Sequence, residues 1–159
     1  MRRIWVARRA DEGLLEKLVK ELDLPARIAQ LLIHRGVASS EEAGEFLCAE
    51  LSTLPDPELF ADLPKAVRLI REAILKGKKI LVVGDYDADG VTATALLVWV
   101  LRDLKGQVTW HIPHRMDEGY GLKDKIVLKA ADGKVGLLIS VDCGTTSIHE
   151  LDLARQKGI

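Results

Sequence analysis

The chain has 159 residues, 48% of them hydrophobic, which is enough for one sizeable core or a core with a small appended unit. Its 23 Lys and Arg residues nearly balance its 24 Asp and Glu residues, so the chain as a whole lacks the basic character of many nucleic-acid-binding proteins. Cys48 and Cys143 are too few for a disulfide framework or a zinc finger within one chain, and they favour a reducing cytoplasm. No apolar run reaches membrane-spanning length, so we expect neither export nor insertion.

The first fifty-five or so residues predict a small helical unit and a linker. Apolar residues recur at three- and four-residue steps across 11–22, as in an amphipathic helix. A second helix is expected after Pro25, with Gly36 as its stop. A third is expected after Ser39, whose hydroxyl can accept from first-turn amides. Two prolines within 54–57 then break the pattern, so we place a domain boundary between residues 55 and 56.

Residues 56–159 alternate between helical periodicity and short aliphatic runs. Such runs are expected of strands that are covered on both faces. The expected strands are 80–83, 108–112 and 137–141, and the expected helices are 66–75, 91–104, 122–131 and 147–157. This alternation predicts an α/β fold with a parallel, doubly wound sheet.

Four acidic residues follow two of these predicted strands. Asp85, Asp87 and Asp89 come directly after the first strand, and Asp142 comes directly after the third. Ligands of doubly wound sheets bind beyond the carboxyl ends of the strands, so these carboxylates could converge on one crevice. Clustered carboxylates repel one another unless a cation neutralises them, and oxygen ligands favour Mg²⁺, Mn²⁺ or Ca²⁺ over Zn²⁺. Two such ions would support hydrolysis of a phosphoester.

The same spacing has two simpler interpretations. Asp-x-Asp-x-Asp-Gly also opens an EF-hand calcium loop, but the twelfth position, normally Glu, is Leu96 here. An EF-hand also needs a helix before the loop, where this chain has a predicted strand. A plain solvated acidic turn remains the second alternative on spacing alone.

Three segments in order resemble the motifs of the DHH phosphoesterases. Residues 84–92 resemble the first motif, 112–122 the second and 141–144 the third, in the forms found in the single-strand-specific DNA exonucleases of that family. Three ordered motifs are far more specific than any one of them. The resemblance implies that 56–159 is the amino-terminal part of a DHH domain and that 1–55 is a helical unit before it.

The resemblance also implies a set of metal ligands. Asp87 and Asp89 would each bind one Mn²⁺ or Mg²⁺ ion, and Asp142 would bridge both. Asp85 would be a near neighbour or a supporting ligand. Many relatives carry a His where this chain has Val83, which leaves the preference between Mn²⁺ and Mg²⁺ open.

The second and third motifs supply candidates for binding the substrate phosphate. A guanidinium donates two parallel bonds to phosphoryl oxygens, so Arg115 is either a phosphate clamp or an ordinary surface residue, and the resemblance favours the clamp. Tyr120 could stack or hydrogen-bond nearby. Glu118 either binds metal through water or holds Arg115. Gly144 would let the backbone approach the substrate phosphate closely.

The resemblance implies a 5′-to-3′ exonuclease acting on single-stranded DNA in DNA repair and recombination. It further implies a monomer in the cytoplasm that works with single-strand-binding protein and recombination helicases. The Asp-His-His motif that names the family is absent from the chain, so we expect these residues to be an inactive amino-terminal fragment of the enzyme. Two alternatives remain: another DHH phosphoesterase, acting on nano-RNA, cyclic dinucleotides or pyrophosphate, or a non-catalytic scaffold.

Overall fold

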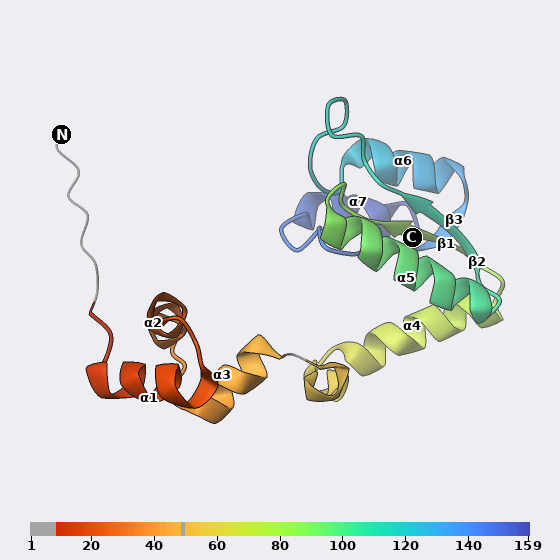
Figure 1. The fold of residues 1–159 in the computed structure, drawn as a ribbon. Helices are drawn as coiled ribbons and strands as arrows, with labels where there is room; N and C mark the ends of the chain where they lie inside the picture. Colours follow the sequence, from red (N-terminus) through yellow and green to blue (C-terminus); the bar gives the residue numbers. More distant parts are fainter. Residues whose placement is uncertain (1–8, 49) are drawn as a thin grey trace, which may run out of the picture. The chain divides into compact units, whose positions relative to one another are not determined.

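A computed structural model describes residues 9–48 and 50–159 of the chain. The chain divides between Leu59 and Phe60 into two compact units, whereas the sequence pattern placed the boundary between residues 55 and 56 (Figure 1). Two short 3₁₀ turns, η1 (Leu51–Thr53) and η2 (Pro57–Leu59), lie in the proline-rich segment before Phe60.

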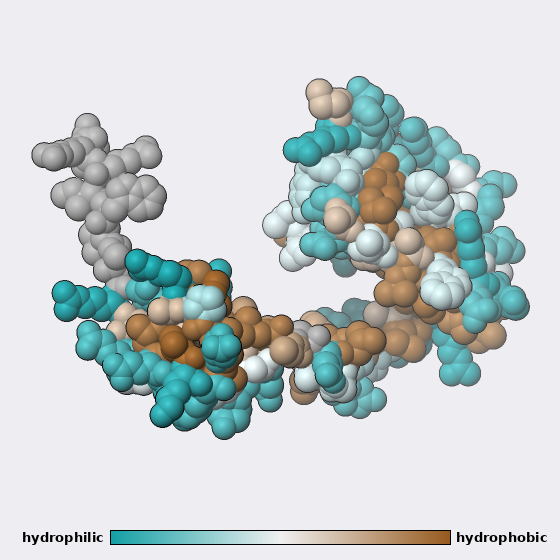
Figure 2. Space-filling view, viewed as in Figure 1, coloured by the Kyte–Doolittle hydropathy of each residue, from teal (hydrophilic) through white to brown (hydrophobic). Residues whose placement is uncertain are grey.

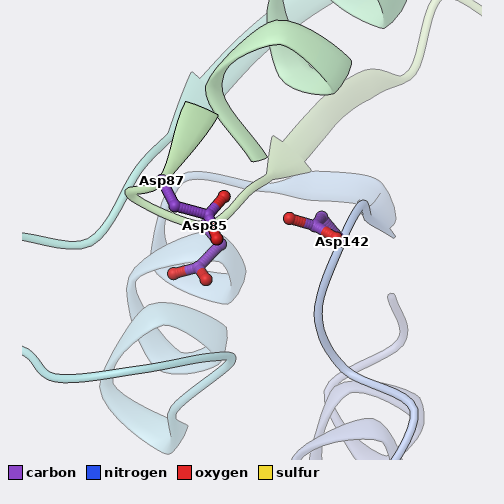
Figure 3. Close-up of side chains that lie close together, drawn as sticks. All are labelled: Asp85, Asp87 and Asp142. Carbon is purple, nitrogen blue, oxygen red and sulfur yellow. The ribbon is translucent and has the colours of Figure 1, made fainter. Parts of the chain in front are cut away.

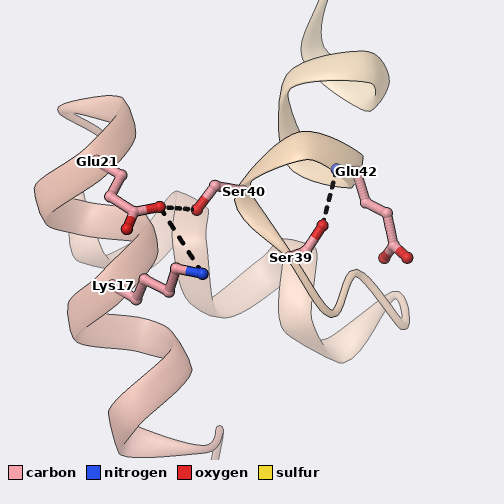
Figure 4. Close-up of polar contacts among 5 residues, drawn as sticks. All are labelled: Lys17, Glu21, Ser39, Ser40 and Glu42. Carbon is pink, nitrogen blue, oxygen red and sulfur yellow. Dashed lines mark hydrogen bonds and ion pairs between the residues drawn. The ribbon is translucent and has the colours of Figure 1, made fainter.

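The first unit contains the three predicted helices, α1 (Glu12–Leu22), α2 (Ala26–His34) and α3 (Ser40–Leu47). The predicted cap of α3 is confirmed, because the Ser39 hydroxyl accepts from the backbone N–H of Glu42 at 3.2 Å (Figure 4). A small core joins the helices, and its buried members are Leu18, Ala29, Leu32, Val37 and Ala43. Apolar burial therefore holds this unit together.

A polar side-chain contact joins α3 to α1. The Ser40 hydroxyl donates to the carboxylate of Glu21, and Lys17 lies 4.0 Å from the same oxygen (Figure 4). Lys17 and Glu21 are about half exposed, so their pairing adds little to stability. The contact with Ser40 instead fixes where α3 begins relative to α1.

The second unit is a three-layer α/β structure with a parallel sheet in the order β2-β1-β3. Its elements are α4 (Leu63–Leu75), β1 (Lys79–Val83), α5 (Ala88–Asp103), β2 (Gln107–His111), α6 (Asp124–Asp132), β3 (Val135–Ser140) and α7 (Ile148–Gln156). The predicted parallel, doubly wound fold is confirmed.

Alternate residues of β1 pack into two separate hydrophobic cores, one on each face of the sheet. Ile80 and Val82 pack with residues of α4 and α5 on one face of the sheet. Leu81 and Val83 pack with residues of α6 and α7 on the other. Burial on both faces explains why the residues of β1 after Lys79 form an unbroken aliphatic run in the sequence.

The start of α5 differs from the sequence prediction at the acidic motif. The helix begins at Ala88, three residues before the predicted start, because the Asp87 side chain accepts from the N–H of Gly90 at 2.9 Å and caps the helix. Asp89 consequently lies in the first turn of α5 and not in a loop. The bounds of the other helices and strands agree with the prediction to within about two or three residues.

Hydrophobic side chains remain exposed along α4 and α5. They line a groove of about 490 Å³ that includes Val67, Ile74, Val100 and Leu104, and Figure 2 shows brown, hydrophobic surface in this part of the unit. Across 9–48 and 50–159, the helices are too short or too polar to cross a membrane.

Candidate metal centre

The topology of the sheet creates a crevice between the ends of β1 and β3. The chain leaves β1 for α5, which packs on one face, and leaves β3 for α7, which packs on the other. A backbone hydrogen bond holds the ends of β1 and β3 side by side, since the Val141 N–H donates to the Val83 carbonyl at 2.9 Å. Such a switch point is where doubly wound sheets bind ligands.

Three carboxylates meet in this crevice. One oxygen from each of Asp85, Asp87 and Asp142 lies within 4.8 Å of the others (Figure 3). Asp85 is buried, with 3% of its surface exposed, and accepts from the N–H of Tyr86 at 2.7 Å. Asp87 and Asp142 are exposed. Oxygen donors at this spacing, from two distant segments, fit a hard divalent cation.

The electrostatics of Asp142 also favour a cation. Loss of solvent in the crevice, followed by the nearby charges of Asp87 and Asp89, raises the pKa of the Asp142 carboxyl above its usual value. The negative charges therefore oppose ionisation of Asp142 in the absence of a cation. A bound divalent ion would offset this repulsion.

Asp89 stands apart from the other predicted ligands. The structure groups Asp85, Asp87 and Asp142, whereas Asp89 is an exposed residue in the first turn of α5 and acts on Asp142 through its charge. A ligand role for Asp89 stays a prediction.

Two glycines allow the acidic segment to lie against α5. A Cβ at Gly90 would come 2.5 Å from the carbonyl oxygen of Asp85, and one at Gly84 would come 1.9 Å from Oγ1 of Thr94. The Thr94 hydroxyl donates to the Gly90 carbonyl at 2.7 Å, which closes the packing. The position of Asp85 is thus fixed by backbone contacts that no larger residue would permit.

Arg115 and two tyrosines lie beside the acids. The Arg115 guanidinium carbon is 5.3 Å from the centroid of the Tyr86 ring, and the Tyr86 and Tyr120 rings are 6.5 Å apart in an edge-to-face arrangement. The Tyr120 hydroxyl donates to the Asp142 carbonyl at 3.4 Å. Burial, followed by the neighbouring acids, raises the pKa of Tyr120, so its hydroxyl keeps its proton at neutral pH. Tyr86 was not anticipated from the sequence.

Glu118 supports the turn that carries Arg115. Its carboxylate accepts from the backbone N–H of His114 at 2.9 Å and lies 3.3 Å from Nε2 of His111, without the alignment of a hydrogen bond. The bond from His114 is the main reason that the pKa of Glu118 is lowered. Glu118 therefore holds the backbone next to Arg115.

A polar cleft of about 700 Å³ opens beside Asp142. Tyr120 and Gly144 both line it, and Gly144 has a φ of 94°. The cleft also presents the side chains of Lys123, Thr145, Thr146 and Ser147. Tyr120 therefore belongs both to this cleft and to the cluster around Arg115.

Known proteins resemble this chain in sequence and in fold. Residues 79–159 match the DHH family, N-terminal domain. The chain is 34% identical over 155 residues to the single-stranded-DNA-specific exonuclease RecJ of Bacillus subtilis, covering 98% of this chain and 20% of that protein. It is 38% identical over 146 residues to the same exonuclease of Thermus thermophilus, covering 90% of this chain and 20% of that protein.

Two solved structures share the fold. A crystal structure of exonuclease RecJ bound to manganese gives a TM-score of 0.60 at 41% identity, over 69% of this chain and 27% of that one. RecJ from Thermus thermophilus in complex with Mn²⁺ gives 0.60 at 31% identity, over 92% of this chain and 20% of that one. The chain spans about a fifth of the length of the curated relatives it matches. On the family match over half its length, the chain belongs to the DHH family.

Proposed function

We propose that this chain forms part of the active site of an exonuclease that hydrolyses single-stranded DNA from the 5′ end by a two-metal mechanism. The observation that carries the proposal is the convergence of Asp85, Asp87 and Asp142 at the switch point of the sheet. Two facts about relatives support the proposal. They are named single-stranded-DNA-specific exonucleases, and a solved structure of one contains manganese.

The acids would hold the cations. Asp87 would contribute the oxygen that does not cap α5, Asp142 would bridge two ions, and Asp89 would complete the set from the first turn of the helix. Asp85 would support them from its buried position. Bound Mn²⁺ or Mg²⁺ would lower the pKa of a water molecule on the metal and would neutralise charge on the phosphate.

Other side chains would bind and orient the DNA. Arg115 would donate to phosphoryl oxygens, and Tyr120, which lines the cleft, would stack or hydrogen-bond nearby. Gly144 would let the backbone in the cleft approach a phosphate. Glu118 would act indirectly by holding the turn before Arg115.

The wider assignments follow from the same proposal. Residues 56–159 would be the amino-terminal part of a DHH domain, and residues 1–55 would be a helical unit before it. The enzyme would act as a cytoplasmic monomer in DNA repair and recombination, with single-strand-binding protein and recombination helicases as partners.

The test is a digestion assay on the complete gene product with Mn²⁺. The protein is offered single-stranded DNA, duplex DNA, a cyclic dinucleotide and pyrophosphate, and we expect turnover of single-stranded DNA from the 5′ end. Asp142→Asn keeps a side chain that tolerates the positive φ of 58° at this position, and we expect it to lower kcat more than about 100-fold.

Asp152→Asn is the matched control. Asp152 lies on α7, where it pairs with Arg155 at 2.9 Å on exposed surface, so we expect activity close to wild type. Wild-type activity of Asp142→Asn would remove Asp142 from the mechanism. If the protein hydrolysed the cyclic dinucleotide or pyrophosphate and not DNA, the proposed substrate would be wrong.

A further inference from the structure

Tyr86 occupies a fixed place between two of the candidate metal ligands. Its own N–H donates to the Asp85 carboxylate at 2.7 Å, and the next residue, Asp87, is held by its cap on α5. The backbone on both sides of Tyr86 is therefore restrained. Its ring is partly buried and lies edge-to-face with Tyr120.

Arg115, by contrast, extends from an exposed turn. Backbone bonds from Asp117 and Glu118 to the His114 carbonyl, at 3.2 and 2.8 Å, shape the turn but leave the guanidinium unrestrained. Within residues 9–48 and 50–159, Arg115 forms no ion pair with a carboxylate, and its guanidinium lies over the face of the Tyr86 ring. A long flexible side chain is thus brought against a rigid aromatic surface.

An aromatic ring restrains a guanidinium without consuming its hydrogen bonds. The ring attracts the flat face of the cation, whereas the N–H donors point outward in the plane of the guanidinium. A carboxylate partner would instead take up those donors and cancel the charge. The arrangement at Tyr86 leaves both the donors and the charge of Arg115 for an incoming anion.

We propose that Tyr86 is a positioning residue that holds Arg115 ready to bind a phosphate of single-stranded DNA beside the acidic crevice. This inference rests on the proposed function and adds a residue to it. Tyr86 acts through Arg115 and does not itself bind metal or phosphate. It joins the first motif of the chain to the second.

The test uses the complete gene product and steady-state kinetics on single-stranded DNA. An exposed cation–π contact predicts that Tyr86→Leu raises KM about two- to fivefold with kcat nearly unchanged, whereas Tyr86→Phe, which keeps the ring face, behaves like wild type. In an Arg115→Ala background, Tyr86→Leu should cause no further rise in KM, because its effect passes through Arg115.

Two controls separate this effect from damage to the site. The Mn²⁺ concentration for half-maximal activity should be the same in Tyr86→Leu and wild type, since the neighbouring acids are retained. Trp99→Leu removes an aromatic ring that is 73% exposed on α5 and should leave KM unchanged.

The outcomes distinguish the inference from the proposed function. An equal KM defect in Tyr86→Phe and Tyr86→Leu, or an undiminished effect of Tyr86→Leu without Arg115, would overturn the positioning role. A wild-type KM in a folded Tyr86→Leu would overturn it too. Absence of DNA hydrolysis by the wild-type protein would instead overturn the proposed function, and the positioning role with it.

Discussion

The two walls of the acidic crevice are built very differently. The wall that carries Asp85 follows β1, which is paired on both sides, and Val82 and Val83 within it have no exposed surface. The wall that carries Asp142 follows β3, whose six residues are all partly exposed. Packing therefore fixes the first wall, whereas the second is less constrained and carries the carboxyl whose pKa is raised.

Because the β1 wall is packed more tightly than the β3 wall, we expect a Gly→Ala substitution to cost more stability on the β1 wall. Gly90→Ala would place a Cβ 2.5–2.7 Å from backbone atoms of Asp85, which cannot rotate away. We expect a loss of about 3 kcal/mol in the free energy of unfolding, measured by urea denaturation of the second unit. A Gly90→Ala protein as stable as wild type would show that the first wall is not rigid.

Gly144→Ala makes the corresponding change on the β3 wall. The added Cβ would meet Oγ of Ser140 at 2.6 Å, which can rotate, and the positive φ of 94° adds conformational strain. We expect a loss of about 1–2 kcal/mol in the same denaturation experiment. Gly119→Ala, at a φ of 72° with no atom within 4 Å of the new Cβ, isolates the cost of the backbone alone. If Gly144→Ala lost more stability than Gly90→Ala, the β3 wall would be the more tightly packed of the two.

The smallest expected effect is the response of Asp142 to pH. Its pKa in the folded chain is raised above 3.8, so the stability that it contributes is fully present below that pH and is lost as the pH rises through the folded pKa. Without metal, Asp142→Asn should therefore melt at the same temperature as wild type at low pH and on the order of a degree higher near pH 7.

Added Mn²⁺ should reverse that order, because wild type binds the cation more tightly and gains stability by mass action. The measurement is thermal melting from pH 4 to 7 with and without chelator. Identical melting curves in chelator at every pH would show that the charges around Asp142 do not oppose its ionisation.

Local patterns in the sequence predicted the fold well. β1 is covered on both faces, so all of it after Lys79 is aliphatic and easily distinguished from its surroundings. The start of α5 was missed because the apolar period begins at Val91, whereas the cap that starts the helix is an Asp that also belongs to the acidic motif. One residue with two roles is hard to assign from its type alone.

The candidate site was only partly predictable for a different reason. The acids at the ends of predicted strands signalled Asp85, Asp87 and Asp142, because the topology of a parallel sheet brings strand ends together. The contact between Tyr86 and Arg115 joins residues far apart in the chain and depends on the path of an irregular turn. The place of Asp89 in the first turn of α5 likewise depends on the helix boundary.

The cap of α5 has a consequence for how cations would be received. Asp87 gives one oxygen to the N–H of Gly90, and the positive end of a sixteen-residue helix dipole lies at the same place. The helix thereby offsets part of the repulsion among the acids before any ion arrives. If Asp87 also binds a cation, as proposed, one carboxylate would serve both the helix and the ion. The stability of the first turn of α5 and the occupancy of the metal centre would then be thermodynamically linked.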